Sequence, residues 1–215
     1  MIGYIITFLR NMKLNKYMFY SQAGQDEWIL EKTKSKKSGY FLDIGAYDGI
    51  KYSNSLYFEK NLEWNGICIE PDLKNYQSLI KNRNCICENI AVNSFKGNVP
   101  FSSSEMGGKI NDPSGYDYYV ECDTLENILI KNNAPRFIDY LSIDVEGNEI
   151  AVIEKFPFNN WKFGAITIEH NLYSDGEHRK KEIQKILNKN GYIIERENVA
   201  HVGLPFEDWY INKET

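Results

Sequence analysis

The sequence predicts an α/β fold in which a seven-stranded, mostly parallel sheet carries helices on both faces and ends in an antiparallel β-hairpin. Short apolar runs alternate with amphipathic segments along most of the 215 residues. This alternation is typical of parallel strands joined by crossover helices. Two early runs, Tyr40–Ile44 and Ile67–Glu70, each place an acid at or near the end of a strand. The length suits one domain, which we expect to cover residues 21–215.

Helices and strands are expected to alternate up to residue 91. Ser21 suits the N-cap of the first helix, and Asp72, which follows Pro71, suits the N-cap of the third. The expected elements are a helix over 21–34, a strand over 40–44, a helix over 54–61, a strand over 67–70, a helix over 72–81 and a strand over 85–91.

The middle of the chain breaks this alternation. Residues 98–102 and 116–122 read as strands separated by a glycine-containing segment, Met106-Gly107-Gly108-Lys109. We expect a small hairpin-like β insertion over about 98–122, whose glycine loop is able to close over a ligand.

The alternation then resumes to the end of the chain. Asp123 with Glu126, and Ser174 with Glu177, have the spacing of capping boxes that open helices. Strands are expected over 138–144 and 165–169, with a helix from Gly147 that ends before Pro157. A later helix ends at Asn190-Gly191. The last strands, over 192–195 and 207–211, are expected to form an antiparallel pair at one edge.

Composition limits the function. The net charge of −5 and the pI near 5.4 argue against binding to nucleic acid. The four cysteines, Cys68, Cys85, Cys87 and Cys122, fall in strand-like runs without metal or redox spacing, so we expect buried thiols in a cytoplasmic protein. The apolar run from Ile2 to Leu9 is too short to span a bilayer. We expect residues 1–20 to form a helical extension that packs on the domain or on a second copy in a homodimer.

Polar side chains gather at the predicted strand ends. In a parallel sheet these ends meet at one edge, where ligands bind. An acid after a single strand is usually a helix cap, but clustered carboxylates repel each other and have little structural value as a set. The predicted strand ends carry Asp43 with Gly45, Glu70, Asn89, Asp144 with Glu146, and Glu169 with His170 and Asn171.

The glycine loop after the first strand favours one class of cofactor. Gly45 and Gly49 do not form the G-x-G-x-x-G pattern of a dinucleotide site, and Asp43 and Asp48 would repel a diphosphate. A nucleoside with a positive centre fits better. S-adenosylmethionine carries a sulfonium, an ammonium and a ribose, so the acids would attract it.

Several short motifs then carry a family resemblance. The segments, within about Ser21 to Ile211, are Ser21-Gln22-x-x-Gln25-Asp26, Phe41-Leu42-Asp43-Ile44-Gly45-Ala46-x-Asp48-Gly49, Ser53-Asn54-Ser55, Ile69-Glu70-Pro71, Asn89-Ile90-Ala91-Val92 and Leu141-Ser142-Ile143-Asp144-Val145-Glu146-Gly147-x-Glu149. In combination the chain resembles a class I S-adenosylmethionine-dependent methyltransferase of the FkbM family. The resemblance implies a Rossmann-like methyltransferase fold.

The resemblance also implies roles for individual residues. Glu70 would accept from both ribose hydroxyls, Gly45 would line the methionine part, and Asn89 would lie by the adenine. Gln22 and Gln25-Asp26 would fold over the cofactor or acceptor. The full expected cofactor set is Gln22, Gln25, Asp43, Gly45, Asp48, Ser53, Asn54, Glu70, Pro71, Asn89 and Asp144.

For the chemistry, we expect transfer of a methyl group to a sugar hydroxyl, in a nucleotide sugar or at a glycan end. A weakly acidic hydroxyl needs a base or a metal. His170, one of three histidines, is the candidate base, beside Asp144 and Glu169. These three residues are also the candidate ligands of Mg²⁺ or Mn²⁺. Candidate acceptor contacts are Glu146, Glu149, Asn171 and Lys109.

Two other functions remain open from the sequence. One is a nicotinamide-dependent oxidoreductase that modifies a sugar, although the loop from Gly45 to Gly49 does not suit a dinucleotide. The other is a non-catalytic, methyltransferase-like scaffold, although such a domain would have no need of polar strand ends.

Overall fold

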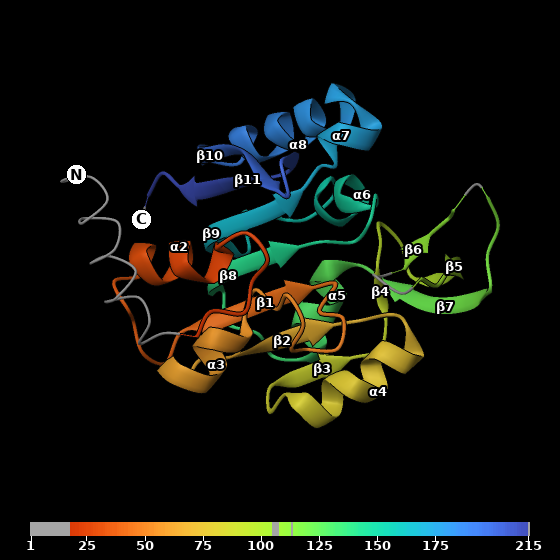
Figure 1. Ribbon diagram of the computed structural model, residues 1–215, viewed down its shortest axis with the longest axis horizontal. Coiled ribbons are helices and arrows are strands. Elements are labelled where there is room, and N and C mark those ends of the chain that lie inside the picture. The colour runs from red at the N-terminus through yellow and green to blue at the C-terminus, as the bar shows by residue number, and fades with distance from the viewer. Residues whose placement is uncertain (1–17, 105–107, 113, 215) are drawn as a thin grey trace.

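The computed structural model describes residues 18–104, 108–112 and 114–214 (Figure 1). Its centre is a seven-stranded sheet in the order β10-β11-β9-β8-β1-β2-β3. The strands are β1 (Tyr40–Ile44), β2 (Asn65–Ile69), β3 (Ile86–Glu88), β8 (Phe137–Ile143), β9 (Lys162–Glu169), β10 (Tyr192–His201) and β11 (Leu204–Asn212). This confirms the predicted sheet and its C-terminal hairpin. The predicted extension over residues 1–20 falls almost entirely outside the described residues.

The middle of the sheet is parallel and fully buried. β1 pairs in parallel with β2 on one side and with β8 on the other, so that Leu42 lies opposite both Ile67 and Leu141. All three residues have no exposed surface. β11 runs antiparallel to both β9 and β10. Its insertion between them places β10 at the edge.

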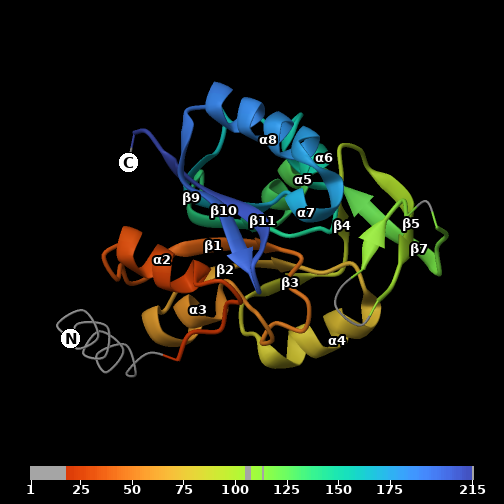
Figure 2. The same ribbon diagram turned by 45° about the horizontal axis from the view of Figure 1, so that its top comes forward.

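Helices cover both faces of the sheet (Figure 2). On one face lie α2 (Gln25–Lys32), α3 (Leu56–Leu62) and α4 (Leu73–Asn82), and on the other α5 (Leu125–Lys131), α6 (Glu149–Ile153) and α8 (Glu177–Lys189). Neighbouring β1 residues belong to different hydrophobic cores: Phe41 lies in the same core as Trp28 of α2, and Leu42 lies in the same core as Leu129 of α5. The alternation of strand side chains therefore builds two cores from one sheet.

Helix starts match the sequence only in part. Asp72 caps α4 as predicted, because its side chain accepts from the backbone N–H of Asn75 at 2.9 Å. Thr124, not Asp123, caps α5. The predicted capping role of Ser21 is wrong: its hydroxyl donates to Asp26 at 2.5 Å, and α2 begins only after Gly24.

The predicted capping box at Ser174 is also wrong. A four-residue helix, α7 (Leu172–Asp175), occupies that segment, and α8 starts after Gly176 without a side-chain cap.

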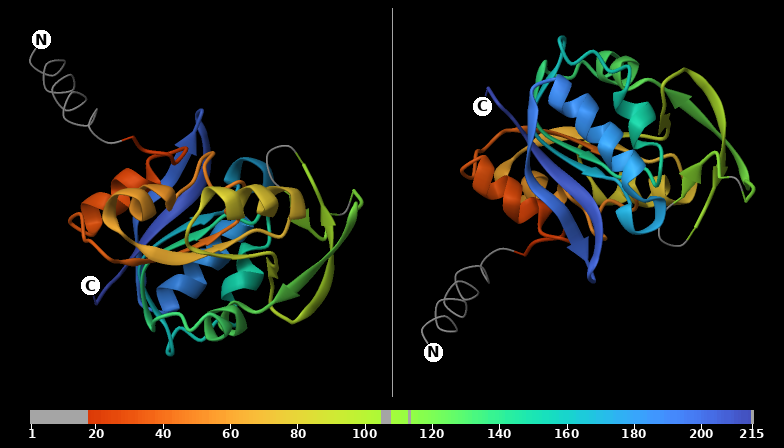
Figure 3. Two further views of the ribbon diagram at one scale, coloured as in Figure 1. Left: turned by 90° about the horizontal axis from the view of Figure 1, so that it is seen from below. Right: turned by 90° about the horizontal axis from the view of Figure 1, so that it is seen from above.

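The insertion is a second sheet and not a simple hairpin. It contains β4 (Ala91–Val92), β5 (Gly97–Ser102), β6 (Lys109–Ile110) and β7 (Tyr118–Asp123) in the order β4-β7-β5-β6. Val99, Phe101, Val120 and Cys122 contribute to its own small core. Figure 3 shows this sheet to one side of the large one, and in Figure 1 it lies beyond the carboxyl ends of the parallel strands.

The predicted strand over 85–91 is divided between the two sheets. Asn89 lies at the break, where its side-chain amide donates to the carbonyl oxygens of Glu70 and Pro71 at 2.9 and 3.0 Å. The cysteines are free thiols, with Cys68 and Cys122 buried. Within the described residues, no helix is long and apolar enough to cross a bilayer.

Candidate active site

A cavity of about 320 Å³ opens at the carboxyl edge of the large sheet. Its walls come from the loops after β1, β2, β8 and β9, from the second sheet, and from the tip of the β10–β11 hairpin. The predicted site residues that line it are Gln22, Asp43, Gly45, Ser53, Asn54, Glu70, Pro71, Asp144, Glu146 and Glu169. Most of the predicted strand-end residues therefore meet in one place.

Gly45 joins the ends of β1 and β8. It has a positive φ of 88°, and a Cβ on it would lie only 1.7 Å from the carbonyl oxygen of Asp144. The backbone N–H groups of Gly45 and Ala46 both donate to the carbonyl oxygen of Ile69, at 2.9 and 3.0 Å. Glycine is thus required at this position because the two strand ends approach each other too closely for a side chain.

Glu70 fixes the loops after β1 and β2. Its Oε2 accepts from the backbone N–H of Tyr47 at 2.9 Å, and its Oε1 accepts from that of Asp72 at 2.8 Å. Burial raises the pKa of this carboxyl to about 8, against the effect of the two N–H donors. Each carboxylate oxygen has a second lone pair, so Glu70 has room to accept from the two hydroxyls of a ribose.

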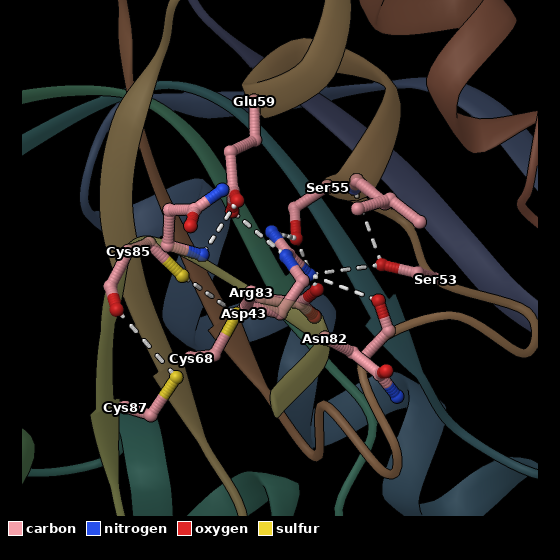
Figure 4. A network of polar contacts seen from close by, with 12 residues as sticks. Asp43, Ser53, Ser55, Glu59, Cys68, Asn82, Arg83, Cys85 and Cys87 are labelled. Carbon is pink, nitrogen blue, oxygen red and sulfur yellow. Dashed lines mark hydrogen bonds and ion pairs between the residues drawn. The ribbon is translucent and has the colours of Figure 1, made fainter. Parts of the chain in front are cut away.

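Arg83 organises the wall beneath β1 (Figure 4). From the end of α4, its Nη1 donates to Ser53 Oγ at 3.2 Å and its Nη2 donates to Ser55 Oγ at 3.0 Å. Ser55 in turn donates to Oδ2 of Asp43 at 2.5 Å. Burial raises the pKa of Asp43, and the serine and Arg83 oppose the shift. Sequence reasoning missed Arg83, because no local pattern connects a helix end to this wall.

Glu59 completes the Arg83 network. Its Oε2 accepts from Nε of Arg83 at 2.8 Å, and the Arg83 side chain has no exposed surface. The guanidinium thus joins α3, α4 and the loop after β1.

Asn54, a lining residue, has an unused hydrogen-bond acceptor. Its Nδ2 donates to Ser142 Oγ at 3.0 Å, while its Oδ1 is buried without a hydrogen-bond partner in the part of the chain that the structure describes. A buried acceptor without a donor is costly. It fits a ligand donor such as an ammonium group.

Three carboxylates converge at the ends of β8 and β9. Oxygens of Asp144, Glu146 and Glu169 lie within 4.8 Å of one another. Burial, and then the charges of neighbouring acids, raise the pKa of both Asp144 and Glu169 well above the usual range. Oε2 of Glu169 is buried and has no partner among the described residues. Such a group is stable when it shares a proton or holds a cation.

His170, the expected base and metal ligand, does not belong to this cluster or to the cavity wall. Its ring is 1% exposed. Nδ1 accepts from the backbone N–H of Leu172 at 3.2 Å, so Nε2 carries the hydrogen that faces Oδ1 of Asp208, also at 3.2 Å. Both ring nitrogens are therefore occupied, and no lone pair is left to take a proton. His170 therefore lies apart from the position that its expected roles need, and Glu146 joins Asp144 and Glu169 as a possible metal ligand.

Three other expected cofactor contacts brace the surrounding loops and lie outside the cavity lining. Gln25 is buried and donates to Oε2 of Glu207 at 2.9 Å. Asp48 accepts from two backbone N–H groups of its own loop, at 2.8 Å each. Asn89 holds the turn after β2, as described above. The structure gives these three residues structural partners in place of the expected contacts.

The remaining expected acceptor contacts also lie outside the lining. Glu149 accepts from the N–H of Gly147 at 2.9 Å and pairs with Arg179 at 3.5 Å. Asn171 has a φ of 48° at the start of α7, and Lys109 pairs with Asp112 at 3.2 Å. The glycine loop expected to close over the acceptor lies partly outside the described residues, but Gly108 does line the cavity.

The C-terminal hairpin adds cavity residues that sequence reasoning missed. His201, Leu204 and Phe206 line the cavity, together with Tyr52 from the loop after β1. The available signal was topological: in a hairpin at this edge, the tip lies on the same side as the carboxyl ends of the parallel strands.

Comparison with known proteins identifies a family and a fold. The family model described as "Methyltransferase FkbM domain" matches residues 43–194. No protein of curated function matches the chain.

Among solved structures, an O-methyltransferase from Bacillus cereus in complex with SAH aligns with a TM-score of 0.54 and 13% identity, over 98% of this chain and 90% of that one. The O-methyltransferase TomG from Streptomyces achromogenes, in complex with SAM, aligns with a TM-score of 0.54 and 12% identity, over 94% and 85%. Cofactor-bound Rv0187 from MTB aligns with a TM-score of 0.56 and 11% identity, over 92% and 83%. Because the sequence identities are so low, these similarities show only that the proteins share a fold.

Proposed function

Because the chain belongs to the FkbM methyltransferase family, we propose that this S-adenosylmethionine-dependent methyltransferase acts on a hydroxyl oxygen of a sugar. S-adenosylmethionine supplies a methyl group activated by a sulfonium. The protein must align the acceptor oxygen with that group and remove the hydroxyl proton. The acid-lined cavity at the carboxyl edge carries the proposal, since its polar groups suit a ligand rich in hydroxyls.

Three lining residues support a cofactor site for this nucleoside. Glu70 has the free acceptor positions for a ribose. Asn54 offers a buried, unpartnered oxygen to an ammonium. Asp43 is held at the end of β1 by Ser55 and adds negative charge on the same side. These groups would bind and orient the cofactor.

The charge of the cavity favours one kind of sugar acceptor. Its lining includes the carboxyl groups of Asp43, Glu70, Asp144, Glu146 and Glu169, whereas Lys51 is the single lysine or arginine among its described lining residues. A diphosphate would find only this one cationic side chain in the lining to neutralise its charge. We therefore favour a neutral or positively charged glycan end over a nucleotide sugar, and the same reasoning disfavours a dinucleotide cofactor.

The three converging carboxylates fit a divalent cation. Asp144, Glu146 and Glu169 offer only oxygen ligands, and Oε2 of Glu169 lacks a partner among the described residues. Oxygen ligands suit Mg²⁺ or Mn²⁺. Such an ion would lower the pKa of a nearby acceptor hydroxyl. Asp144, Glu146 and Glu169 would hold it, without the expected contribution of His170.

Calorimetric titration with S-adenosylhomocysteine, and separately with NAD, tests the cofactor. We expect micromolar binding of the first, on the order of −8 kcal/mol, and no heat from NAD. Glu70→Gln should weaken this binding, while Glu88→Gln, at the end of β3 and outside the lining, should not. Binding of NAD alone would support the oxidoreductase, and a folded protein that binds neither ligand would support the scaffold.

Methyl transfer from labelled S-adenosylmethionine then tests the acceptor. Methyl glycosides and short oligosaccharides would be compared with nucleotide sugars, each with EDTA, Mg²⁺ or Mn²⁺. We expect transfer to the uncharged sugars and loss of activity in EDTA. Preference for nucleotide sugars would contradict the charge argument, and full activity in EDTA would contradict the metal site.

A further inference from the structure

The tip of the β10–β11 hairpin forms one wall of the cavity. β11 runs antiparallel to β9 and to β10, so β10 ends at the same edge as the parallel strands. His201 is the last residue of β10 and pairs with Leu204, the first residue of β11, across a turn at Val202 and Gly203. In Figure 3 this tip lies beside the segment that precedes α2.

The wall that contains His201 is continuous with the three converging carboxylates. Glu207 of β11 lies opposite Glu169 of β9 in the sheet register. Phe206, next to Glu207, lines the cavity with His201 and Glu169. The hairpin therefore places an imidazole in the cavity that also contains the carboxylates.

One hydrogen bond fixes which nitrogen of His201 carries the hydrogen. Nδ1 lies 3.1 Å from the backbone carbonyl oxygen of Gln22. A carbonyl oxygen only accepts, so Nδ1 donates, and in the neutral ring the lone pair is on Nε2. Among the described residues, Nε2 has no hydrogen-bond partner. This arrangement is the reverse of that at His170, where both nitrogens are occupied.

A second contact holds the ring in place. The ring of Tyr52 packs edge-on against it, with centroids 6.0 Å apart, and Tyr52 forms a β-bridge with Ser21. The amine of Lys51 lies 5.3 Å from the centre of the Tyr52 ring. Three segments distant in sequence thus converge to hold His201 at the cavity wall.

We propose that His201 is the general base that takes the proton from the acceptor hydroxyl, an inference that rests on the proposed function. The hydroxyl oxygen forms its bond to the methyl carbon as the carbon–sulfur bond breaks and its electron pair passes to sulfur. The hydroxyl proton moves to Nε2 of His201. The resulting imidazolium returns the proton to solvent after the product leaves.

Two variants separate this role from a purely structural one. In His201→Asn the side-chain amide can still donate to Gln22, as Nδ1 does, but it has no basic nitrogen. We expect unchanged affinity for S-adenosylhomocysteine and methyl transfer slower by about 10²- to 10⁴-fold on the best uncharged sugar acceptor. In His201→Ala, added imidazole should restore part of the rate. His178→Asn, on the exposed side of α8, is the matched control with the wild-type rate.

Nitrogen NMR of the ¹⁵N-histidine-labelled protein tests the inference without any acceptor. The chain has three histidines, and His201→Asn assigns the signals of one. We expect His201 to carry its hydrogen on Nδ1, and His170 on Nε2. A hydrogen on Nε2 of His201 in the neutral ring, or a wild-type rate in His201→Asn, would overturn the base. Absence of S-adenosylhomocysteine binding by the wild-type protein would instead overturn the proposed function.

Discussion

The carbonyl oxygen of Asp144 occupies the space that a side chain on Gly45 would need, 1.7 Å from the ideal Cβ position. The two residues directly follow the neighbouring parallel strands β1 and β8. The backbone N–H of Asp144 donates to the carbonyl oxygen of Ile44 at 3.0 Å. The floor of the cavity therefore depends on one residue having no side chain.

Gly45→Ala should disrupt both stability and cofactor binding. The clash with Asp144 adds to the cost of a left-handed backbone, and we expect a loss of about 3 kcal/mol or more in the free energy of unfolding. Gly191→Ala is the control, since Gly191 has a φ of 89° and nothing within 4 Å of its Cβ position. It should lose only about 1–2 kcal/mol. Urea unfolding compares the two, and equal losses would show that the clash relaxes.

Glu70 should make cofactor affinity depend on pH. Its pKa is raised to about 8 by burial, so the unliganded protein holds this proton below that pH. Ribose hydroxyls need acceptors, so binding favours the carboxylate and releases the proton. Affinity for S-adenosylhomocysteine should rise from about pH 6 to about pH 8 and then level off. Calorimetry in buffers of different ionisation heat measures the released proton.

Glu70→Gln should remove this pH dependence and Glu88→Gln should keep it, whereas wild-type affinity that is flat with pH would contradict the role of Glu70.

The raised pKa of Glu70 should change folding stability with pH in the opposite direction. The raised pKa means that the folded state holds the proton more tightly than the unfolded state. The stability of the unliganded protein should therefore fall as pH rises from about 4.5 to about 8.

Arg83→Met should weaken both the fold and the cofactor site. It leaves the buried carboxylates of Glu59 and Asp43 without their cation, at a cost of about 3–5 kcal/mol in unfolding free energy. Lys81→Met, on the exposed end of the same helix, should change stability by less than about 0.5 kcal/mol. Adding Glu59→Gln to Arg83→Met should recover part of the loss in urea unfolding. A double variant with strictly additive losses would argue against this coupling.

His170→Ala should reduce stability and leave the chemistry in place. It removes a buried partner of Asp208 and costs about 1–3 kcal/mol in unfolding free energy. Turnover per folded molecule should remain near that of the wild-type protein, in contrast to His201→Asn. Thermal unfolding and methyl transfer on the same samples separate the two effects. Full stability with lost turnover would return the role of base to His170.

The sheet could be predicted well because the burial of a strand is visible in its own local sequence. Strands with two buried faces are apolar throughout, and β1 was placed at its observed bounds, residues 40–44. Capping was predicted less well. Thr124 and Asp123 are both good caps by composition, and only the packed structure shows that the side chain of Thr124 accepts from the N–H of Asn127.

Site residues were predicted correctly where their position directly after a parallel strand is enough to bring them to the site. Residues after parallel strands meet at one edge, which brought Asp43, Glu70 and Asp144 together. Side-chain direction was the missing information. Successive residues of an extended chain point to opposite sides, so once Glu169 faces the cavity, His170 faces away. Arg83 and His201 reach the site through contacts between distant segments, which no local pattern records.

The second sheet has a consequence for how acceptor choice could change between related proteins. Its strands come from one continuous stretch, residues 91–123, and the two ends of that stretch lie side by side, with Ala91 opposite Cys122 and Val92 opposite Asp123. It supplies Phe101, Gly108 and Ile110 to the cavity wall. The whole stretch can therefore be exchanged as one unit, because both of its ends lie on the paired strands β4 and β7. Recombination at that place would offer a new cavity wall while the loops after β1, β2 and β8 stay as they are.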